Sequence, residues 1–187
     1  FSYIQQSVEV YRNNPKVPYS LSSDLVYCVY PDRNGVVWLG TAVGVSKYDR
    51  MSRRFTTTRM DPDVTPERAS SYFYCVMEDS RGEVWVVSFN RQINKLDRRT
   101  GTVKPALRET PELERLLRDE QVTQVYETSD GRLWFATVSR GLHRYDPASR
   151  AIRSFYVEEH KFSGSELWTL YEDRDGMLWI GLDQGLL

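Results

Sequence analysis

A repeat of roughly 45 residues is the strongest pattern in this chain of 187 residues. Each copy carries a Gly-x-x-Trp unit, and the tryptophans lie 45 to 49 residues apart, at Trp38, Trp85, Trp134 and Trp179. A segment ending in Tyr-Asp or Leu-Asp follows each of the first three tryptophans at a similar distance. A short apolar and aromatic segment precedes each Gly-x-x-Trp unit. These elements recur in register, so the chain is predicted to be a repeat protein.

Each copy has the residue pattern of β-strands. The segments are rich in β-branched and aromatic residues, and turn clusters such as Asn34-Gly35 and Asp175-Gly176 separate them. Glycine at these turns supplies the positive φ that a tight hairpin needs. Apolar residues do not recur at the i, i+3, i+4 spacing of helical repeats. The period therefore predicts an all-β fold of four-stranded antiparallel β-propeller blades, with the repeated tryptophans packed between blades.

The repeat also predicts how the chain is divided. We expect the outer strand of a preceding blade and a linker (1–20), three blades (21–63, 64–110, 122–160), a short helical insertion (111–121) and an incomplete blade (161–187). In the insertion, Thr110 is a candidate N-cap, Pro111 suits the first helical turn, and three leucines form one apolar stripe. A helical turn is also expected near Thr65-Pro66. The whole chain is interpreted as a fragment of a larger propeller.

Composition excludes several classes of partner. The chain has 25 Lys and Arg against 26 Asp and Glu, so it lacks the basic excess that nucleic acids and anionic membranes attract. No apolar run is long enough to insert into a membrane. Cys28 and Cys75 occupy equivalent inner-strand positions and are expected to be free thiols. The arginines that follow the third strands, such as Arg98 and Arg99, are expected on a solvated rim.

Few residues are candidates for a site. Trp168 is a weak ligand-binding candidate, because the other copies carry Tyr27, Tyr74 and Thr123 at its position and it could line the axial channel or simply fill it. No catalytic set and no metal site are expected. The two histidines have no third ligand at zinc spacing, and His143 is predicted to be an exposed strand residue. Asp173-x-Asp175-Gly176 resembles the start of a calcium loop, but a hairpin turn is favoured because a strand follows it.

The repeat unit V-Y-x-V-x-E-D-x-x-G-x-[VL]-W-[ILFV]-[GA]-T-x-x-x-G-[VL]-x-[KR]-Y-D resembles the two-component regulator propeller repeat. The copies nearest to this pattern are 125–137 and 170–181, and the Ser20-Leu21-Ser22 lead into the first inner strand is also similar to the family's. The resemblance covers nearly the whole chain. The second copy departs most, because Val87-Ser88 replaces Gly-Thr and Arg91-Gln92 replaces the usual glycine.

Membership of this family would imply a sensor rather than an enzyme. Such propellers form periplasmic ectodomains of membrane-anchored bacterial regulators, including hybrid sensor kinases and diguanylate cyclases, which often respond to carbohydrates. The resemblance implies a ligand-sensing or signal-relaying role without a cofactor. The implied partners are a small glycan, further blades of the parent chain and a second parent subunit. Two alternatives stay open: a propeller enzyme of the polysaccharide lyase or glycosidase kind, and a protein-interaction scaffold.

Overall fold

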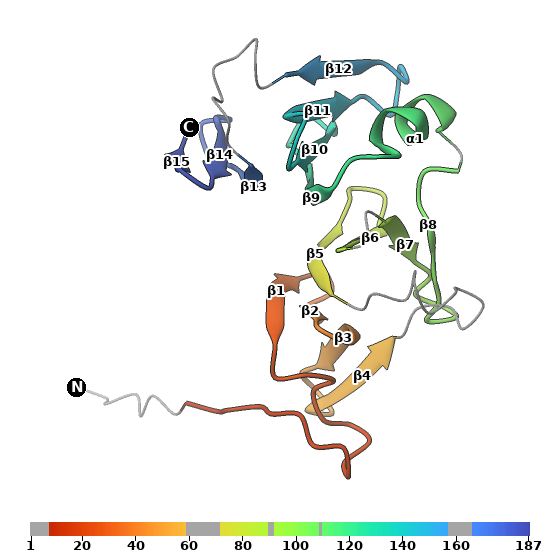
Figure 1. Ribbon diagram of the computed structural model, residues 1–187. Coiled ribbons are helices and arrows are strands. Elements are labelled where there is room, and N and C mark those ends of the chain that lie inside the picture. The colour runs from red at the N-terminus through yellow and green to blue at the C-terminus, as the bar shows by residue number, and fades with distance from the viewer. Residues whose placement is uncertain (1–7, 59–71, 90–91, 109, 157–165) are drawn as a thin grey trace.

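The computed structural model describes residues 8–58, 72–89, 92–108, 110–156 and 166–187. Over these ranges the chain is all-β apart from one short helix, and the strands form four antiparallel sheets in which neighbours along the chain pair with each other. Each sheet is one propeller blade. In Figure 1 the inner strands β1, β5, β9 and β13 lie toward one side and the outer strands β4 and β8 toward the other. The β-propeller fold predicted from the repeat is confirmed.

Three blades have four strands and the fourth has three in the described residues. Blade 1 comprises β1 (Val26–Pro31), β2 (Val37–Thr41), β3 (Gly44–Asp49) and β4 (Arg54–Thr58). Blade 2 comprises β5 (Phe73–Glu78), β6 (Val84–Ser88), β7 (Gln92–Leu96) and β8 (Val103–Pro105). Blade 3 comprises β9 (Val122–Glu127), β10 (Leu133–Thr137), β11 (Leu142–Tyr145) and β12 (Ile152–Phe155). Blade 4 comprises β13 (Leu167–Glu172), β14 (Leu178–Leu182) and β15 (Gly185–Leu186).

The apolar core lies between the blades. Trp38 of blade 1 is 3% exposed and packs with residues of blade 2 such as Phe73, and Trp85 of blade 2 is 4% exposed and packs with Phe135 of blade 3. Trp134 is partly buried against the cluster shared with blade 4. These three indoles confirm the predicted packing. Trp179 is 42% exposed, because no described blade covers that face of blade 4.

One aspartate organises the turn between the first two strands of blades 1, 2 and 4. One of its carboxylate oxygens accepts hydrogen bonds from two backbone N–H groups of the turn, and the other accepts the indole N–H of the tryptophan six residues later. The pairs are Asp32–Trp38 at 2.9 Å, Asp79–Trp85 at 2.9 Å and Asp173–Trp179 at 2.6 Å. In blade 3 the Thr128 hydroxyl accepts the Trp134 N–H instead. A buried indole thus keeps its one donor satisfied.

A glutamate at the end of each later inner strand reaches back to the preceding blade. Its carboxylate accepts the backbone N–H of the residue after the turn aspartate or threonine, and in two cases also the hydroxyl of that residue. The pairs are Glu78 with Arg33, Glu127 with Ser80 and Glu172 with Ser129. Pro31 occupies the corresponding position in blade 1. These contacts are charge-assisted and cross the blade interface, so they add to the apolar packing.

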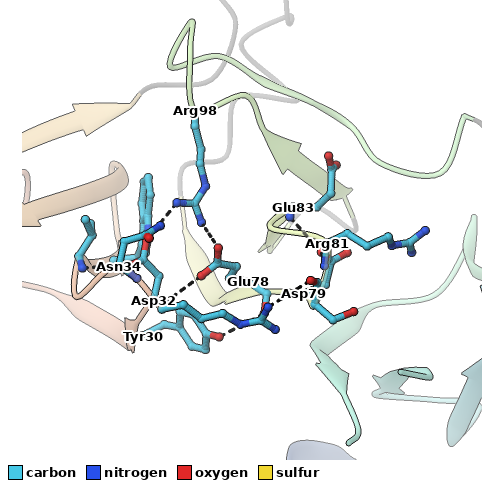
Figure 2. Close-up of polar contacts among 12 residues, drawn as sticks. Tyr30, Asp32, Asn34, Glu78, Asp79, Arg81, Glu83 and Arg98 are labelled. Atoms are coloured by element: carbon cyan, nitrogen blue, oxygen red, sulfur yellow. Dashed lines mark hydrogen bonds and ion pairs between the residues drawn. The ribbon is translucent and has the colours of Figure 1, made fainter. Parts of the chain in front are cut away.

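Arg98 crosses the interface between blades 1 and 2 (Figure 2). Its guanidinium lies 3.2 Å from the carboxylate of Asp32 and 2.7 Å from that of Glu78, both of which are buried. It also lies 5.6 Å from the ring centroid of Trp38. The prediction that the arginines of this turn form a solvated rim is therefore wrong for Arg98. Two neighbouring buried carboxylates repel each other and are stabilised by a nearby cation. The turn after β7 places the Arg98 guanidinium next to both of them.

The segment between blades 2 and 3 contains helix α1 (Pro111–Leu117), where the leucine stripe predicts a helix. Leu113 and Leu117 are buried in the core cluster of these two blades. The sequence predicts that Thr110 caps the helix, but its side chain makes no capping hydrogen bond. The Thr110 hydroxyl instead donates a hydrogen bond to the carbonyl of Leu107. The strand expected at the N-terminus and the helical turn expected near Thr65 lie outside the described residues. No helix in the described part of the chain has the length and apolar character needed to cross a membrane.

Candidate functional site

Every inner strand has an irregular register near its start. The pairing with the second strand shifts between Val26 and Cys28 and between Phe73 and Cys75, and likewise in blades 3 and 4. The residues at these β-bulges are Tyr27, Tyr74, Thr123 and Trp168. A bulge turns one side chain away from the regular alternation and is often conserved as a feature of a site. The repeat thus places four side chains at one end of the inner strands, the end opposite the aspartate turns.

Four aromatic side chains gather at this end of blades 1 and 2, and we call them the aromatic mouth: Tyr27, Tyr72, Tyr74 and Phe89. Their rings meet edge to face, with centroids 5.9 to 6.4 Å apart. Tyr27, Tyr72 and Phe89 are each about half exposed. A backbone hydrogen bond from Phe89 N to Tyr72 O holds the loop and the linker together. The mouth therefore presents fixed apolar ring edges and phenolic hydroxyls to solvent.

Blade 3 borders the aromatic mouth with polar groups. The Gln121 side chain donates a hydrogen bond of 3.0 Å to the Tyr74 hydroxyl, and burial raises the pKa of that hydroxyl. Thr123, at the bulge itself, is buried and donates to the carbonyl of Leu167 in blade 4. The bulge of blade 3 thus fastens two blades together, whereas those of blades 1 and 2 carry the rings.

Trp168 occupies the bulge of blade 4 and is 44% exposed. The sequence singled it out because it differs from its repeat equivalents, and the structure places it at the same end of the inner strands as the aromatic mouth. No ring contact joins it to the four rings among the described residues. Its ligand-binding role stays a prediction. Sequence reasoning missed Tyr72 and Phe89, which lie outside the inner strand. The backbone hydrogen bond between them recurs in the other three blades, but their aromatic side chains do not recur.

His143 is buried, so the prediction that it is an exposed strand residue is wrong. Its Nδ1 lies 2.9 Å from the Ser154 hydroxyl, and burial, aided by Arg140, lowers its pKa to about 4. Ser46 and Asn94 are buried at the same repeat position. Both faces of an internal blade strand can be covered by neighbours, so a polar residue there need not reach solvent. His160 lies outside the described residues.

The remaining candidates have structural roles. Cys28 and Cys75 are free thiols, as expected, and burial raises their pKa values to about 11 and 12. The Asp173 turn is a hairpin turn, in which the indole N–H of Trp179 and two backbone N–H groups lower the pKa of Asp173. Among the described residues, no three His, Cys, Asp or Glu side chains come together as metal ligands.

The sequence matches the family model described as "two component regulator propeller" at residues 20–42, 116–139 and 161–184. Blades 1, 3 and 4 are two-component regulator propeller repeats. The matched segments contain the inner strands and Trp turns of blades 1, 3 and 4, and blade 2, the copy that departs most from the pattern, is not matched. No curated protein matches the sequence.

Solved structures with the same fold include extracellular domains of two-component systems. One extracellular domain of a hybrid two-component system from B. thetaiotaomicron is 20% identical, with a TM-score of 0.67 over 95% of this chain and 22% of its own. A second from the same organism is 18% identical, with a TM-score of 0.72 over 95% of this chain and 24% of its own. A virginiamycin B lyase from Staphylococcus aureus is 18% identical, with a TM-score of 0.61 over 87% of this chain and 51% of its own. These similarities show the fold, and the chain spans about a quarter of the length of the two extracellular domains.

Proposed function

We propose that these blades belong to the periplasmic, ligand-sensing part of a membrane-anchored two-component-type regulator, and that they act by binding rather than by catalysis. The family match and the fold shared with extracellular sensor domains support this proposal. The observation that carries it is the aromatic mouth, where four rings gather at the bulge end of blades 1 and 2 and three of them are about half exposed. An exposed cluster of rings is costly to leave in water and is commonly a binding surface.

The mouth suits a carbohydrate. A sugar ring has apolar C–H faces edged by hydroxyl groups. Tyrosine offers the matching combination, an apolar ring and a hydroxyl that both donates and accepts hydrogen bonds. The hydroxyls of Tyr27 and Tyr72 and the amide of Gln121 lie beside the rings. We propose a short glycan lying across blades 1 and 2, with Trp168 as a further contact.

The experiment is isothermal titration calorimetry of the full chain against a panel of neutral oligosaccharides. At least one glycan is expected to bind, and the Tyr27→Ala and Phe89→Ala variants are expected to weaken its affinity by about tenfold or more, the loss expected of a residue central to an interface. Tyr19→Ala is the matched control, because Tyr19 is an exposed tyrosine that stacks on Arg54 of the outer strand. A panel without any binding, or equal losses in all three variants, would reject the site.

The proposed signal is a rearrangement of parent subunits. A ligand can shift such an equilibrium only if it binds one arrangement more tightly than the other. We therefore expect the dimerisation constant of the parent's periplasmic region, measured by analytical ultracentrifugation, to change when the glycan is added. An unchanged constant at saturating glycan would contradict a role in dimer signalling and leave the binding site itself unaffected.

A further inference from the structure

A pocket of about 180 Å³ lies between blades 2 and 3, at the end of the blades opposite the aromatic mouth. Its floor includes Trp85 of β6, Tyr145 of β11 and Leu113 of α1, all of which are buried. Its lining also holds three basic side chains, which are Arg81, Lys95 and Arg150. A pocket of this size accommodates a single six-membered ring rather than a polymer.

The charge in this pocket is positive. No acidic residue lines it, and Lys95 forms an ion pair with Glu83 at 3.1 Å. Within the described residues no carboxylate pairs with Arg81 or Arg150. Two guanidinium groups beside an apolar floor favour an anion, because arginine binds carboxylate and sulfate groups through paired N–H donors.

The interface between blades 2 and 3 differs from the one between blades 1 and 2 at one repeat position beside the indole ring. Arg98, which lies over Trp38 between blades 1 and 2, corresponds in the repeat to Pro147 between blades 2 and 3. Pro147 lines the pocket and has no long side chain to cover Trp85. Among the described residues, the Trp85 ring therefore has Lys95 over it at 4.6 Å and no second cation, whereas the Trp38 ring has both Lys47 and Arg98.

Arg150 is held in an unusual backbone conformation. Its φ is 59°, and the equivalent residue of blade 2 is Gly101 with a φ of 71°. Glycine adopts this left-handed backbone conformation without strain, so the turn geometry gives no reason for an arginine at this position. Arg53 is the equivalent residue in blade 1, with a φ of 54°, and its guanidinium pairs with Glu9. Arg150 has the same geometry and faces the pocket instead.

We propose that this pocket binds a small ring compound carrying one carboxylate or sulfate group, such as a uronic acid or a sulfated monosaccharide. Arg81 and Arg150 hold the anionic group, and the edge of Trp85 and the α1 leucine contact the ring. Because the pocket and the aromatic mouth lie at opposite ends of the blades, this site is distinct from the one under Proposed function and can succeed or fail independently of it.

The test is calorimetric titration of the full chain with glucuronate and with glucose 6-sulfate, and with glucose as the neutral probe. The charged sugars are expected to bind at millimolar concentrations or below and to compete with sodium sulfate, whereas glucose is expected not to bind. Because the anion carries the recognition, the affinity is expected to fall as the salt concentration rises. Equal binding of glucose, or no binding of either charged sugar, would overturn the proposal.

Three variants locate the site. Arg150→Gly copies blade 2 and relieves the left-handed strain, so it is expected to leave the fold intact and to weaken glucuronate binding about tenfold or more. Arg53→Gly removes the same charge from the same position of blade 1 and is expected to leave the affinity unchanged. Pro147→Arg supplies the side chain that lies over Trp38 at the first interface and is expected to block binding. Unchanged affinity in Arg150→Gly, or an equal loss in Arg53→Gly, would place the ligand elsewhere.

Discussion

The two ends of the blades differ in what the repeat preserves. At the turn end the side chains themselves recur, as the aspartate that holds the indole N–H and the glutamate that reaches the preceding blade. At the mouth end the backbone bulge recurs, but its side chain changes from tyrosine to threonine to tryptophan. We infer that repeated side chains maintain the fold and that a repeated backbone with changing side chains provides recognition.

Among the polar contacts, the largest effect on the free energy of unfolding is expected at a turn aspartate. Asp79→Ala leaves two backbone N–H groups and the buried Trp85 indole without their acceptor, so it is expected to cost about 3 kcal/mol in the free energy of unfolding measured with urea. Asp79→Thr copies blade 3, where Thr128 accepts the indole N–H, and is expected to cost less. If Asp79→Thr were as damaging as Asp79→Ala, the indole contact would not be the reason.

The next prediction concerns the pH dependence of stability at His143, a buried position whose residue differs between blades. Its pKa is lowered from 6.5 to about 4, so the unfolded chain binds more protons and stability is lost as the pH falls from about 6.5 toward 4. The loss is on the order of 2 to 3 kcal/mol by pH 4. His143→Asn does not titrate, so its unfolding free energy should vary less with pH over this range. Identical pH profiles for the two proteins would contradict a neutral, buried imidazole.

Arg98→Ala tests the cation at the first interface. It leaves Asp32 and Glu78 buried beside each other without a partner, and because the arginine side chain is itself 32% exposed, we expect a discounted cost of about 2 kcal/mol. Arg99→Ala, in the same turn, is the control and is expected to change the unfolding free energy by less than about 0.5 kcal/mol. Equal effects would indicate that Arg98 lies on a solvated rim after all.

The smallest effect is expected where one hydrogen bond of an interface is removed. The Ser80 hydroxyl donates to Glu127 at 2.7 Å, while the backbone N–H of Ser80 remains bound in a Ser80→Ala variant. The expected cost is about 1 kcal/mol or less. Thermal unfolding of Ser80→Ala and Ser129→Ala should give similar shifts, since the two serines make the same contact. Unequal shifts would show that the interfaces are not equivalent.

Sequence reasoning reached the fold because the fold depends on residues that repeat. The Trp spacing and the glycines of the turns predict blades, and the structure gives Gly35, Gly82, Gly131 and Gly176 the positive φ that these turns need. The Glu-Asp pair was visible in the repeat unit as well, but only the structure shows that its glutamate contacts the preceding blade. That contact is a long-range consequence of stacking, and strand periodicity does not encode it.

The residues of the candidate binding site were harder to predict from the sequence than the fold. Trp168 stood out because it breaks the repeat. Tyr72 and Phe89 join the aromatic mouth from just outside the strands, at backbone positions that recur in every blade while their side chains change. Arg98 and His143 were misplaced for a related reason. Strand and turn patterns assume a solvent-exposed side, whereas neighbouring blades bury positions that an isolated sheet would expose.

The most direct measurement compares two tryptophan variants by urea unfolding of the full chain. Trp85, 4% exposed with its N–H bound by Asp79, recurs in every blade, whereas Trp168, 44% exposed, stands at a bulge where the residue changes. Trp85→Ala is expected to lower the unfolding free energy by about 3 to 5 kcal/mol, and Trp168→Ala by less than about 1 kcal/mol. Losses of equal size, or a larger loss at Trp168, would contradict the division between the end that maintains the fold and the end that recognises a ligand.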